Sequence, residues 1–395
     1  MKVGIVVPHI FMHKDILPSV IFSPATLAIS LAEGLMSLDV SVTLFSPGPI
    51  NTEVHNINAD LSYFERELKL RGDSYVDLLK KHPFTFITLA RQVQSELVAK
   101  AYEMANKGEF DLIHIYTNEE EIALPFASLC RKPVVFTHHD PFNFQIRYKS
   151  VFPKYRELNW LSMSYQQRQS MPHDTNWVGN VYHGLPAGED FTPVTKPTDD
   201  YFAYIGRIIE PKGVHLAIQA VKQYNKSSGH KLSLKIAGKH YSGHKKDTYW
   251  QTSIKPEIDD LEIEYVGFID SNIKKRNFLA NAKALIVPSI FDEPFGIVIA
   301  EALACGTPIV ALNSGAIPEI IKDHRTGIIV NKKTQQDGTI DGLATASDIA
   351  KALKEVGTIE RKSCRQDYEK RFTIKRMCLE HKAVYESLTQ LPNQS

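Results

Sequence analysis

The sequence predicts an α/β protein of two doubly wound domains that face each other across a cleft. Three observations support this prediction. The chain has 395 residues, which is more than one hydrophobic core usually holds. Short apolar, β-branched runs alternate with helical patterns along its length, an order typical of parallel sheets covered by helices. A polar segment rich in Pro, Asp and Thr, residues 185–200, separates two such series.

The expected strands form one series on each side of that segment. The first series is KVGIVVP, SVTLFSP, DLIHIY, PVVFTH, LNWLSMS and NWVGNVY. The second is YFAYIGR, LSLKIAG, LEIEYVG, KALIVPS, TPIVALN and TGIIV. The chain then ends in helical patterns, DIAKALKEV and a long stretch from Arg361 to about Leu391. We therefore expect a first domain at residues 1–190 and a second at residues 200–375.

Composition and charge exclude several classes of protein. The 46 basic and 45 acidic side chains nearly cancel, so the sequence offers no clustered basic face for duplex nucleic acid. No apolar run approaches the ~20 residues of a membrane span, and the apolar start ends at Pro8 as a buried strand would. The four cysteines stand far apart without C-x-x-C spacing, which argues against a zinc site and against a disulfide scaffold. This cysteine usage favours the cytoplasm. The cysteines are Cys130, Cys305, Cys364 and Cys378.

The segment ALIVPSIFDEPFGIVIAEALACGTPIVAL, residues 284–312, carries the strongest functional signal. It predicts a buried strand, a loop, a helix closed by Gly306 and a second strand. Glu293 lies in the loop at the carboxyl end of the strand, and Glu301 lies about one turn into the helix. The first amides of this helix, which lack partners within it, belong to Phe295, Gly296 and Ile297.

This arrangement predicts a nucleotide-sugar site. The helix N-terminus suits a phosphate, whereas the carboxylates suit hydroxyls, Glu293 those of a sugar and Glu301 those of a ribose. The alternative is a loop acid and a solvated helix residue without a ligand. That alternative is weakened because Glu301 stands in an otherwise apolar helix, where a buried carboxylate without a partner costs several kcal/mol.

A second element, YIGRIIEPKGVHLAI, places Arg207 and Lys212 in a loop between a strand and a helix. A diphosphate needs positive charge at close range, which Arg supplies as a fork and Lys as a point charge. Gly206 keeps the loop small, and Gly238 ends another strand of the same domain, where it permits either close approach of a ligand or an ordinary turn. Alternatively, the basic loop is a solvated surface.

These residues resemble the retaining glycosyltransferases of family 4, which have the GT-B fold of two Rossmann-like domains and an E-x7-E signature. The resemblance covers residues 200–375 and includes EPFGIVIAEALACGTPIVA and GR…EPKG. It implies that Arg207 and Lys212 hold the diphosphate, Glu293 the transferred sugar and Glu301 the ribose, with the backbone of 295–297 facing sugar and phosphate. It implies no bound metal or other cofactor, and a terminal helix, residues 376–395, that packs back on the first domain.

The first half resembles a subgroup described as tetrahydrobiopterin glucosyltransferases, through NWVGNVYHGLP, PVVFTHHDP and IAGK. This resemblance favours UDP-glucose as donor. The match to relatives also places His139 near the reacting sugar, and Arg168 either near phosphate and on the acceptor side or, alternatively, on an exposed surface. We expect His138 to bind backbone in the turn before Asp140, and His114 to sit in the packed strand layer. The relatives' Gly-Gly pair is absent, because Phe22-Ser23 occupies its place in a loop, residues 9–26, that is longer and more apolar.

The resemblance thus implies a retaining hexosyltransferase, for which we favour front-face substitution on an unidentified hydroxyl acceptor. Two alternatives stay open. The first is a sugar phosphorylase or nucleotide-sugar epimerase on the same fold, and the second is a non-catalytic protein that binds a nucleotide sugar. The segment KKHPFTFITLARQ also has two interpretations, a peripheral contact with a membrane surface or a helix that packs its apolar side on the core.

Overall fold

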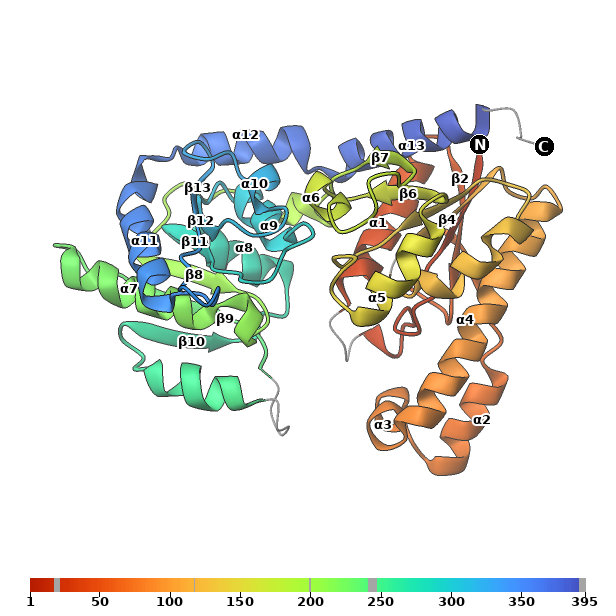
Figure 1. The fold of residues 1–395 in the computed structure, drawn as a ribbon, viewed down its shortest axis with the longest axis horizontal. Coiled ribbons are helices and arrows are strands. Elements are labelled where there is room, and N and C mark those ends of the chain that lie inside the picture. Colours follow the sequence, from red (N-terminus) through yellow and green to blue (C-terminus); the bar gives the residue numbers. More distant parts are fainter. Residues whose placement is uncertain (18–21, 117, 199, 241–246, 391–395) are drawn as a thin grey trace. The chain divides into compact units, whose positions relative to one another are not determined.

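The structure, a computed structural model, describes residues 1–17, 22–116, 118–198, 200–240 and 247–390. The chain divides into two compact units (Figure 1). Unit 1 comprises Met1–Pro186 and Ile374–Ser395, and unit 2 comprises Ala187–Thr373. The boundary therefore falls inside the polar segment 185–200, and the part of that segment after Pro186 belongs to unit 2, where Phe191 is buried.

The described part of unit 1 contains a seven-stranded parallel sheet with the order β3-β2-β1-β4-β5-β6-β7. Every strand predicted for the first half is present, and β3 is an additional strand. The strands are β1 (Lys2–Val6), β2 (Ser41–Ser46), β3 (His55–Asn58), β4 (Leu112–Tyr116), β5 (Val134–Thr137), β6 (Asn159–Ser162) and β7 (Trp177–Asn180).

Helices cover both faces of this sheet. They are α1 (Ser23–Met36), α2 (Ser62–Arg71), α3 (Tyr75–Lys81), α4 (Pro83–Asn106), α5 (Ile146–Val151), α6 (Tyr165–Arg168) and α13 (Ile374–Gln390). Successive side chains of β4 point to opposite faces. Ile113 packs in the core with Leu97 of α4, and the ring of His114 contacts Tyr385 of α13. Helix α13, at the end of the chain, packs against α1 (Figure 1).

The described part of unit 2 contains a six-stranded parallel sheet with the order β10-β9-β8-β11-β12-β13. Its strands confirm the second predicted series: β8 (Tyr201–Ile205), β9 (Ser233–Ala237), β10 (Ile263–Gly267), β11 (Ala284–Val287), β12 (Ile309–Leu312) and β13 (Gly327–Val330). Its helices are α7 (Val214–Ser227), α8 (Asn272–Ala280), α9 (Ile297–Ala304), α10 (Ile317–Ile320), α11 (Gly342–Glu355) and α12 (Arg361–Arg371). Both units are thus of the predicted α/β class.

A helical lobe of α2, α3 and the first turns of α4 extends from the sheet of unit 1 (Figure 1). The lobe has its own apolar cluster, in which Phe64, Tyr75 and Phe86 pack together. The loop after β1 contributes Ile10 and Ile16 to the same cluster, so part of its apolar character serves packing. Among the described residues, no helix combines the length and the apolarity needed to cross a membrane.

Candidate functional site

The sheet topology of unit 2 brings the two predicted donor loops together. Strands β8 and β11 are neighbours, and the chain leaves β8 toward β9 on one side and β11 toward β12 on the other. In doubly wound sheets, ligands bind at the carboxyl ends of strands where the order reverses in this way. The loop after β8 touches the loop after β11, because the amides of Ile290 and Phe291 both donate to the carbonyl of Pro211, at 2.9 and 3.0 Å.

Lys212 and Glu293 meet at this junction. The Lys212 ammonium donates to the Glu293 carboxylate in an ion pair, and the Ser289 hydroxyl donates to the same carboxylate oxygen at 2.8 Å. The ammonium also lies 5.1 Å from the ring centroid of Phe291. Both charged side chains are largely buried. Lys212, predicted to bind phosphate, is therefore paired with Glu293, predicted to bind the sugar. A bound nucleotide sugar must break this ion pair to make its own contacts with the two side chains.

Arg207 and the predicted glycines surround the junction. Arg207 is exposed, and its guanidinium makes no hydrogen bond or ion pair among the described residues. Gly206 donates its amide to the carbonyl of Ala237 at 3.1 Å. A Cβ at Gly238 would lie 3.1 Å from the carbonyl carbon of Gly206 and closer still to its oxygen. Glycine at position 238 thus permits two strand ends to pack together. This packing requires glycine whether or not a ligand binds there.

Helix α9 begins at the predicted phosphate position. Gly296 precedes its first residue, Ile297, with φ +91°, a left-handed conformation that favours glycine. The Phe295 side chain is buried, 5.8 Å between ring centroids from Phe372. Because this side chain faces the interior of unit 2, only the backbone of Phe295 is available to a ligand. The helix N-terminus therefore offers amides and a positive dipole end.

Glu301 is 4% exposed inside α9. One carboxylate oxygen accepts a hydrogen bond from Lys275 of α8 at 2.9 Å, and the other finds no partner among the described residues. Burial raises the pKa of Glu301 above its ordinary value, although the Lys275 ammonium acts in the opposite direction. The expectation that something polar meets this carboxylate is confirmed by Lys275, and the second oxygen is an acceptor still available for a hydroxyl donor.

Three residues that the sequence did not single out hold the Glu293 loop. The Ser314 hydroxyl donates to the carbonyl of Phe291 at 2.7 Å, and the amide of Ala316 donates to the carbonyl of Glu293 at 2.7 Å. The Lys332 ammonium donates to the carbonyl of Ile290 and to Ser314 Oγ, each at 3.0 Å. Burial lowers the pKa of Lys332. The loops that follow β11, β12 and β13 thus form one hydrogen-bonded support for Glu293.

Gly315, which stands between Ser314 and Ala316, gives the first prediction. Its φ is +55°, and an added Cβ would lie 2.6 Å from the carbonyl carbon of Asp292 and closer still to the backbone of Glu293. Gly338 also has a positive φ, +83°, but a Cβ there meets nothing within 4 Å. We expect Gly315→Ala to lower the free energy of unfolding by about 2 kcal/mol more than Gly338→Ala, because overpacking adds to backbone strain. Denaturant unfolding measures both, and equal losses would contradict the steric argument.

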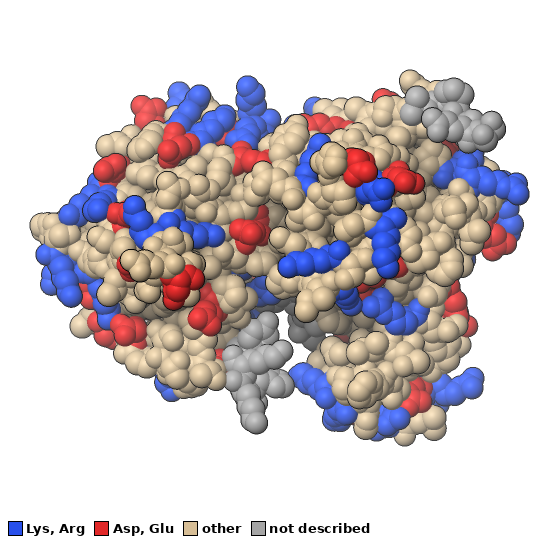
Figure 2. Space-filling view, in the orientation of Figure 1, with Lys and Arg blue, Asp and Glu red and all other residues tan. Residues whose placement is uncertain are grey.

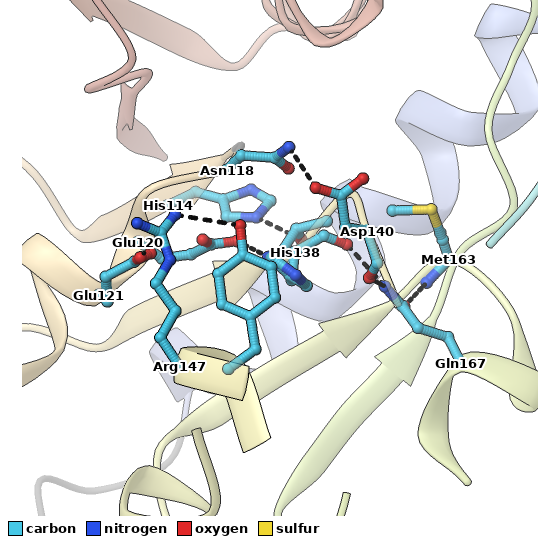
Figure 3. A network of polar contacts seen from close by, with 11 residues as sticks. His114, Asn118, Glu120, Glu121, His138, Asp140, Arg147, Met163 and Gln167 are labelled. Carbon is cyan, nitrogen blue, oxygen red and sulfur yellow. Dashed lines mark hydrogen bonds and ion pairs between the residues drawn. The ribbon is translucent and has the colours of Figure 1, made fainter. Parts of the chain in front are cut away.

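In unit 1, a buried polar network surrounds the end of β5 (Figure 3). His138 Nδ1 lies 2.7 Å from a carboxyl oxygen of Glu120, and neither side chain is exposed. Burial lowers the pKa of His138 to about 4 and raises that of Glu120 well above its ordinary value, so burial favours the neutral form of both side chains. The expectation that the His138 ring binds turn backbone is wrong. Instead, the turn backbone is held by Gln167, which donates to the carbonyls of His138 and Asp140 at 2.8 and 3.0 Å.

His139 lies in a cluster of aromatic and imidazole rings. Its ring stacks on that of His183, with centroids 5.2 Å apart and an interplanar angle of 12°, and meets Tyr116 edge-on at 4.6 Å. His139 Nε2 is buried without a partner among the described residues. Burial lowers the pKa of His139 well below its ordinary value, with the neighbouring histidines acting in the same direction. The ring is therefore a neutral hydrogen-bonding group at physiological pH.

Helix α13 supports this cluster. Tyr385 of α13 lies 2.6 Å from His114 Nδ1, and the other ring nitrogen of His114 lies 2.8 Å from the hydroxyl of Thr137. The expectation that His114 sits in the packed strand layer is confirmed, because its side chain is fully buried. Arg376 of α13 donates to the carbonyl of His183 at 3.1 Å, which fixes the backbone of the stacked ring.

Arg168 lies at the ends of β6 and β7. Its Nε donates to the hydroxyl of Ser162 at 2.8 Å, and its Nη2 donates to the carbonyl of Gly179 at 2.7 Å. Its guanidinium also lies 5.0 Å from the ring centroid of Trp177. These contacts link two strands and give Arg168 a structural role. Any contact with an acceptor would be additional to that role.

The loop after β1 is described in part. The ring centroids of Phe22 and His9 lie 4.5 Å apart, whereas residues 18–21 lie outside the described residues.

The buried histidines give a second prediction, a loss of stability in mild acid. Burial lowers the pKa of His13 and of five more, to about 3 for His183 and about 4 for His381 and His138. Below the ordinary pKa of 6.5, the unfolded chain therefore binds protons that the folded unit excludes, and stability falls as pH falls. Each histidine contributes up to about 1.4 kcal/mol per pH unit, and Glu120, whose pKa is raised, offsets one of them. The other two of the five are His114 and His139.

Hydrogen exchange of unit 1 between pH 7.5 and 5 measures this stability, after correction for the intrinsic pH dependence of exchange. His230→Gln removes an exposed histidine and should leave the profile unchanged. His183→Phe removes one buried titrating ring and should make the slope smaller. A stability that stays constant or increases from pH 6.5 to 5 would show that the cluster is protonated in the folded protein.

Comparisons with known proteins agree with this geometry. Residues 189–363 match the family described as glycosyl transferases group 1. The uncharacterised glycosyltransferase MJ1607 of Methanocaldococcus jannaschii is 24% identical over 335 residues, or 77% of this chain and 80% of the relative. The sucrose-phosphate synthase of Thermosynechococcus elongatus has a TM-score of 0.70 at 18% identity, covering 98% and 99% of the two chains. Anabaena Alr3699/HepE in complex with UDP-glucose has a TM-score of 0.65 at 16% identity, covering 99% and 100%. The fold is therefore that of the GT-B glycosyltransferases.

Proposed function

We propose that this chain, whose residues 189–363 match the group 1 glycosyl transferases, moves a hexose from a nucleotide-diphosphate sugar to a hydroxyl acceptor with retention of configuration. The observation that carries the proposal is the junction of the loops after β8 and β11, where Lys212 meets Glu293 beside the start of α9. A nucleotide sugar needs a cation for its diphosphate and acceptors for its hydroxyls within a few ångströms of each other, and this junction supplies both.

Each part of the donor has a proposed ligand in unit 2. The diphosphate lies between Arg207, Lys212 and the first amides of α9. The sugar hydroxyls donate to Glu293, whose present partners, Lys212 and Ser289, show that it is a strong acceptor. The ribose diol donates to Glu301, whose second oxygen is buried without a partner among the described residues. The proposal assigns no metal ion, in line with the family resemblance.

The proposed reaction is a front-face substitution. The acceptor oxygen bonds to the anomeric carbon on the face from which the diphosphate leaves, and the departing phosphate oxygen takes the acceptor's proton. Charge grows on the diphosphate in the transition state, so Lys212, Arg207 and the α9 amides stabilise that state more than the bound donor. The neutral ring of His139 is proposed to hydrogen-bond a hydroxyl of the sugar or of the acceptor.

UDP-glucose is the favoured donor. The support is the resemblance of NWVGNVYHGLP and PVVFTHHDP to glucosyltransferases, and the complex of Alr3699/HepE, a protein of the same fold, with UDP-glucose. A panel of UDP-, GDP- and ADP-sugars tests it by thermal shift and by donor hydrolysis without acceptor. Stabilisation and hydrolysis with UDP-glucose above the other donors are expected. Phosphate-dependent formation of a sugar phosphate would instead indicate a phosphorylase, and binding without turnover a non-catalytic protein.

A further inference from the structure

The tip of the helical lobe exposes apolar side chains that the fold does not use. Phe84 and Ile87 lie one turn apart on α4 and are 87% and 51% exposed, and Leu70 at the end of α2 is 78% exposed. An ion pair of 2.5 Å between Lys81 and Asp73 ties the last residue of α3, two residues before α4 begins, to the turn after α2, so Leu70 and Phe84 stand at the same end of the lobe. Large apolar side chains gathered on a surface usually mark a binding site.

Packing accounts for only one side of these helices. Phe86 and Ala90 of α4 are buried in the cluster that also contains Phe64 and Leu78. The interpretation of KKHPFTFITLARQ as a helix that packs on a core is therefore confirmed for its buried side. Phe84 and Ile87 lie on another side of the same helix and take no part in that cluster. Their exposure has no explanation in the packing of unit 1.

The charges at this tip are arranged unequally. Three of its acids are held in local contacts: Glu67 pairs with Arg71 at 2.6 Å, Asp73 pairs with Lys81, and Asp77 caps α3. A fourth, Glu65, is exposed one turn before Lys69. Lys69 and Lys80 are exposed and pair with no carboxylate in the described part of the chain. Figure 2 shows Lys and Arg side chains beside the uncharged surface of the lobe, with some Asp and Glu side chains among them. The whole chain has a net charge of only +1, so this positive character is local.

We propose that this tip, formed by Leu70, Phe84 and Ile87 with Lys69 and Lys80, binds the surface of a bilayer that contains anionic lipids. Apolar side chains of this size enter the boundary between headgroups and acyl chains, and neighbouring lysines attract anionic headgroups. A second copy of the chain fits the tip less well, because pairing through the same face brings lysines against lysines. If the proposed function holds, the first acceptors to test are hydroxyl compounds at a membrane surface.

Sedimentation of the full chain with lipid vesicles tests this inference. We expect binding to vesicles of phosphatidylcholine with phosphatidylglycerol, little binding to phosphatidylcholine alone, and weaker binding at high salt. The double variant Phe84→Ser/Ile87→Ser should lower the partition coefficient by about tenfold or more, and so should Lys69→Glu/Lys80→Glu. The control Leu261→Ser/Leu343→Ser changes exposed apolar residues of unit 2 and should bind as the wild type does.

Three results would overturn the inference. One is no binding of the folded wild type to anionic vesicles, and another is equal binding by the tip variants. The third is a wild type that dimerises in solution and becomes monomeric when Phe84 and Ile87 are replaced, which would show that a second copy covers the tip. Donor hydrolysis in the same preparations separates the two proposals, because vesicle binding without hydrolysis leaves the inference standing while the proposed function fails.

Discussion

Replacing Lys212 with alanine should lower the rate of sugar transfer by about 10²–10³-fold while unit 2 stays folded. Lys212 lies beside the residue that is predicted to bind the sugar, because its ammonium is paired with the Glu293 carboxylate. In the proposed reaction, this ammonium stabilises the charge that grows on the leaving diphosphate. The variant also leaves the largely buried Glu293 without its cation, so donor affinity should fall as well. Steady-state kinetics with UDP-glucose and circular dichroism measure rate and fold.

Lys222 provides the matched control for this experiment. It lies on α7, in the same unit, and its ammonium pairs with Glu257 at 2.5 Å, away from the loops after β8 and β11. Lys222→Ala therefore removes a lysine and an ion pair without touching the proposed site, and its rate should equal that of the wild type. A wild-type rate in Lys212→Ala would remove this residue from the mechanism. Circular dichroism distinguishes a rate lost through unfolding from a rate lost because the ammonium is absent.

The positions of most strands follow from patterns that a single sequence displays well. The central strands of a parallel sheet are buried on both faces, so each appears as a short apolar run between turns. Strand β3 was not predicted, because it lacks such an apolar run. Its sequence is HNIN, it lies at the edge of the sheet, and it is only partly buried. Its Asn56 and Asn58 side chains donate to the hydroxyl of Ser46, so polar contacts replace the apolar signal.

The acids of the candidate site were predictable because their context is unusual. A glutamate inside the apolar helix α9 requires a partner, and the sequence shows this need without showing what meets it. Lys275 meets Glu301, but its neighbours Lys274 and Arg276 in α8 are equally basic. The rotation of α8 about its axis selects Lys275, and that rotation depends on packing between helices distant in sequence.

The supports of the site were not predictable. Gly315 and Lys332 follow β12 and β13, and their proximity to the Glu293 loop depends on the order of strands in the sheet. The histidine cluster has the same origin, because it joins β4, the end of β5, the segment after β7 and α13. Motifs identify the residues that contact ligands by their type and spacing. They carry little information on groups that act by holding those residues in place.

We expect His139→Ala to lower the rate of transfer to an acceptor by about 10²-fold, with little change in affinity for the nucleotide. The ring nitrogen Nε2 is buried without a partner among the described residues, so it has unused hydrogen-bonding capacity at the end of β5. The proposed nucleotide ligands all belong to unit 2, whereas His139 belongs to unit 1. Isothermal titration with UDP and initial rates with UDP-glucose measure the two effects. Equal losses in affinity and rate would contradict a role confined to transfer.

His183 then tests whether the neutral state of His139 matters. In the proposed role the ring acts uncharged, so activity is lost when falling pH protonates it, and a lower pKa keeps activity to lower pH. Burial against the stacked His183 holds the pKa of His139 well below 6.5. We expect His183→Ala to admit water beside His139, to raise its pKa toward 6.5 and to produce an acid limb in the pH profile of the transfer rate near that value. His183→Phe fills the same space and should keep the wild-type profile. Identical profiles for the two variants would show that packing by His183 does not set the charge of His139.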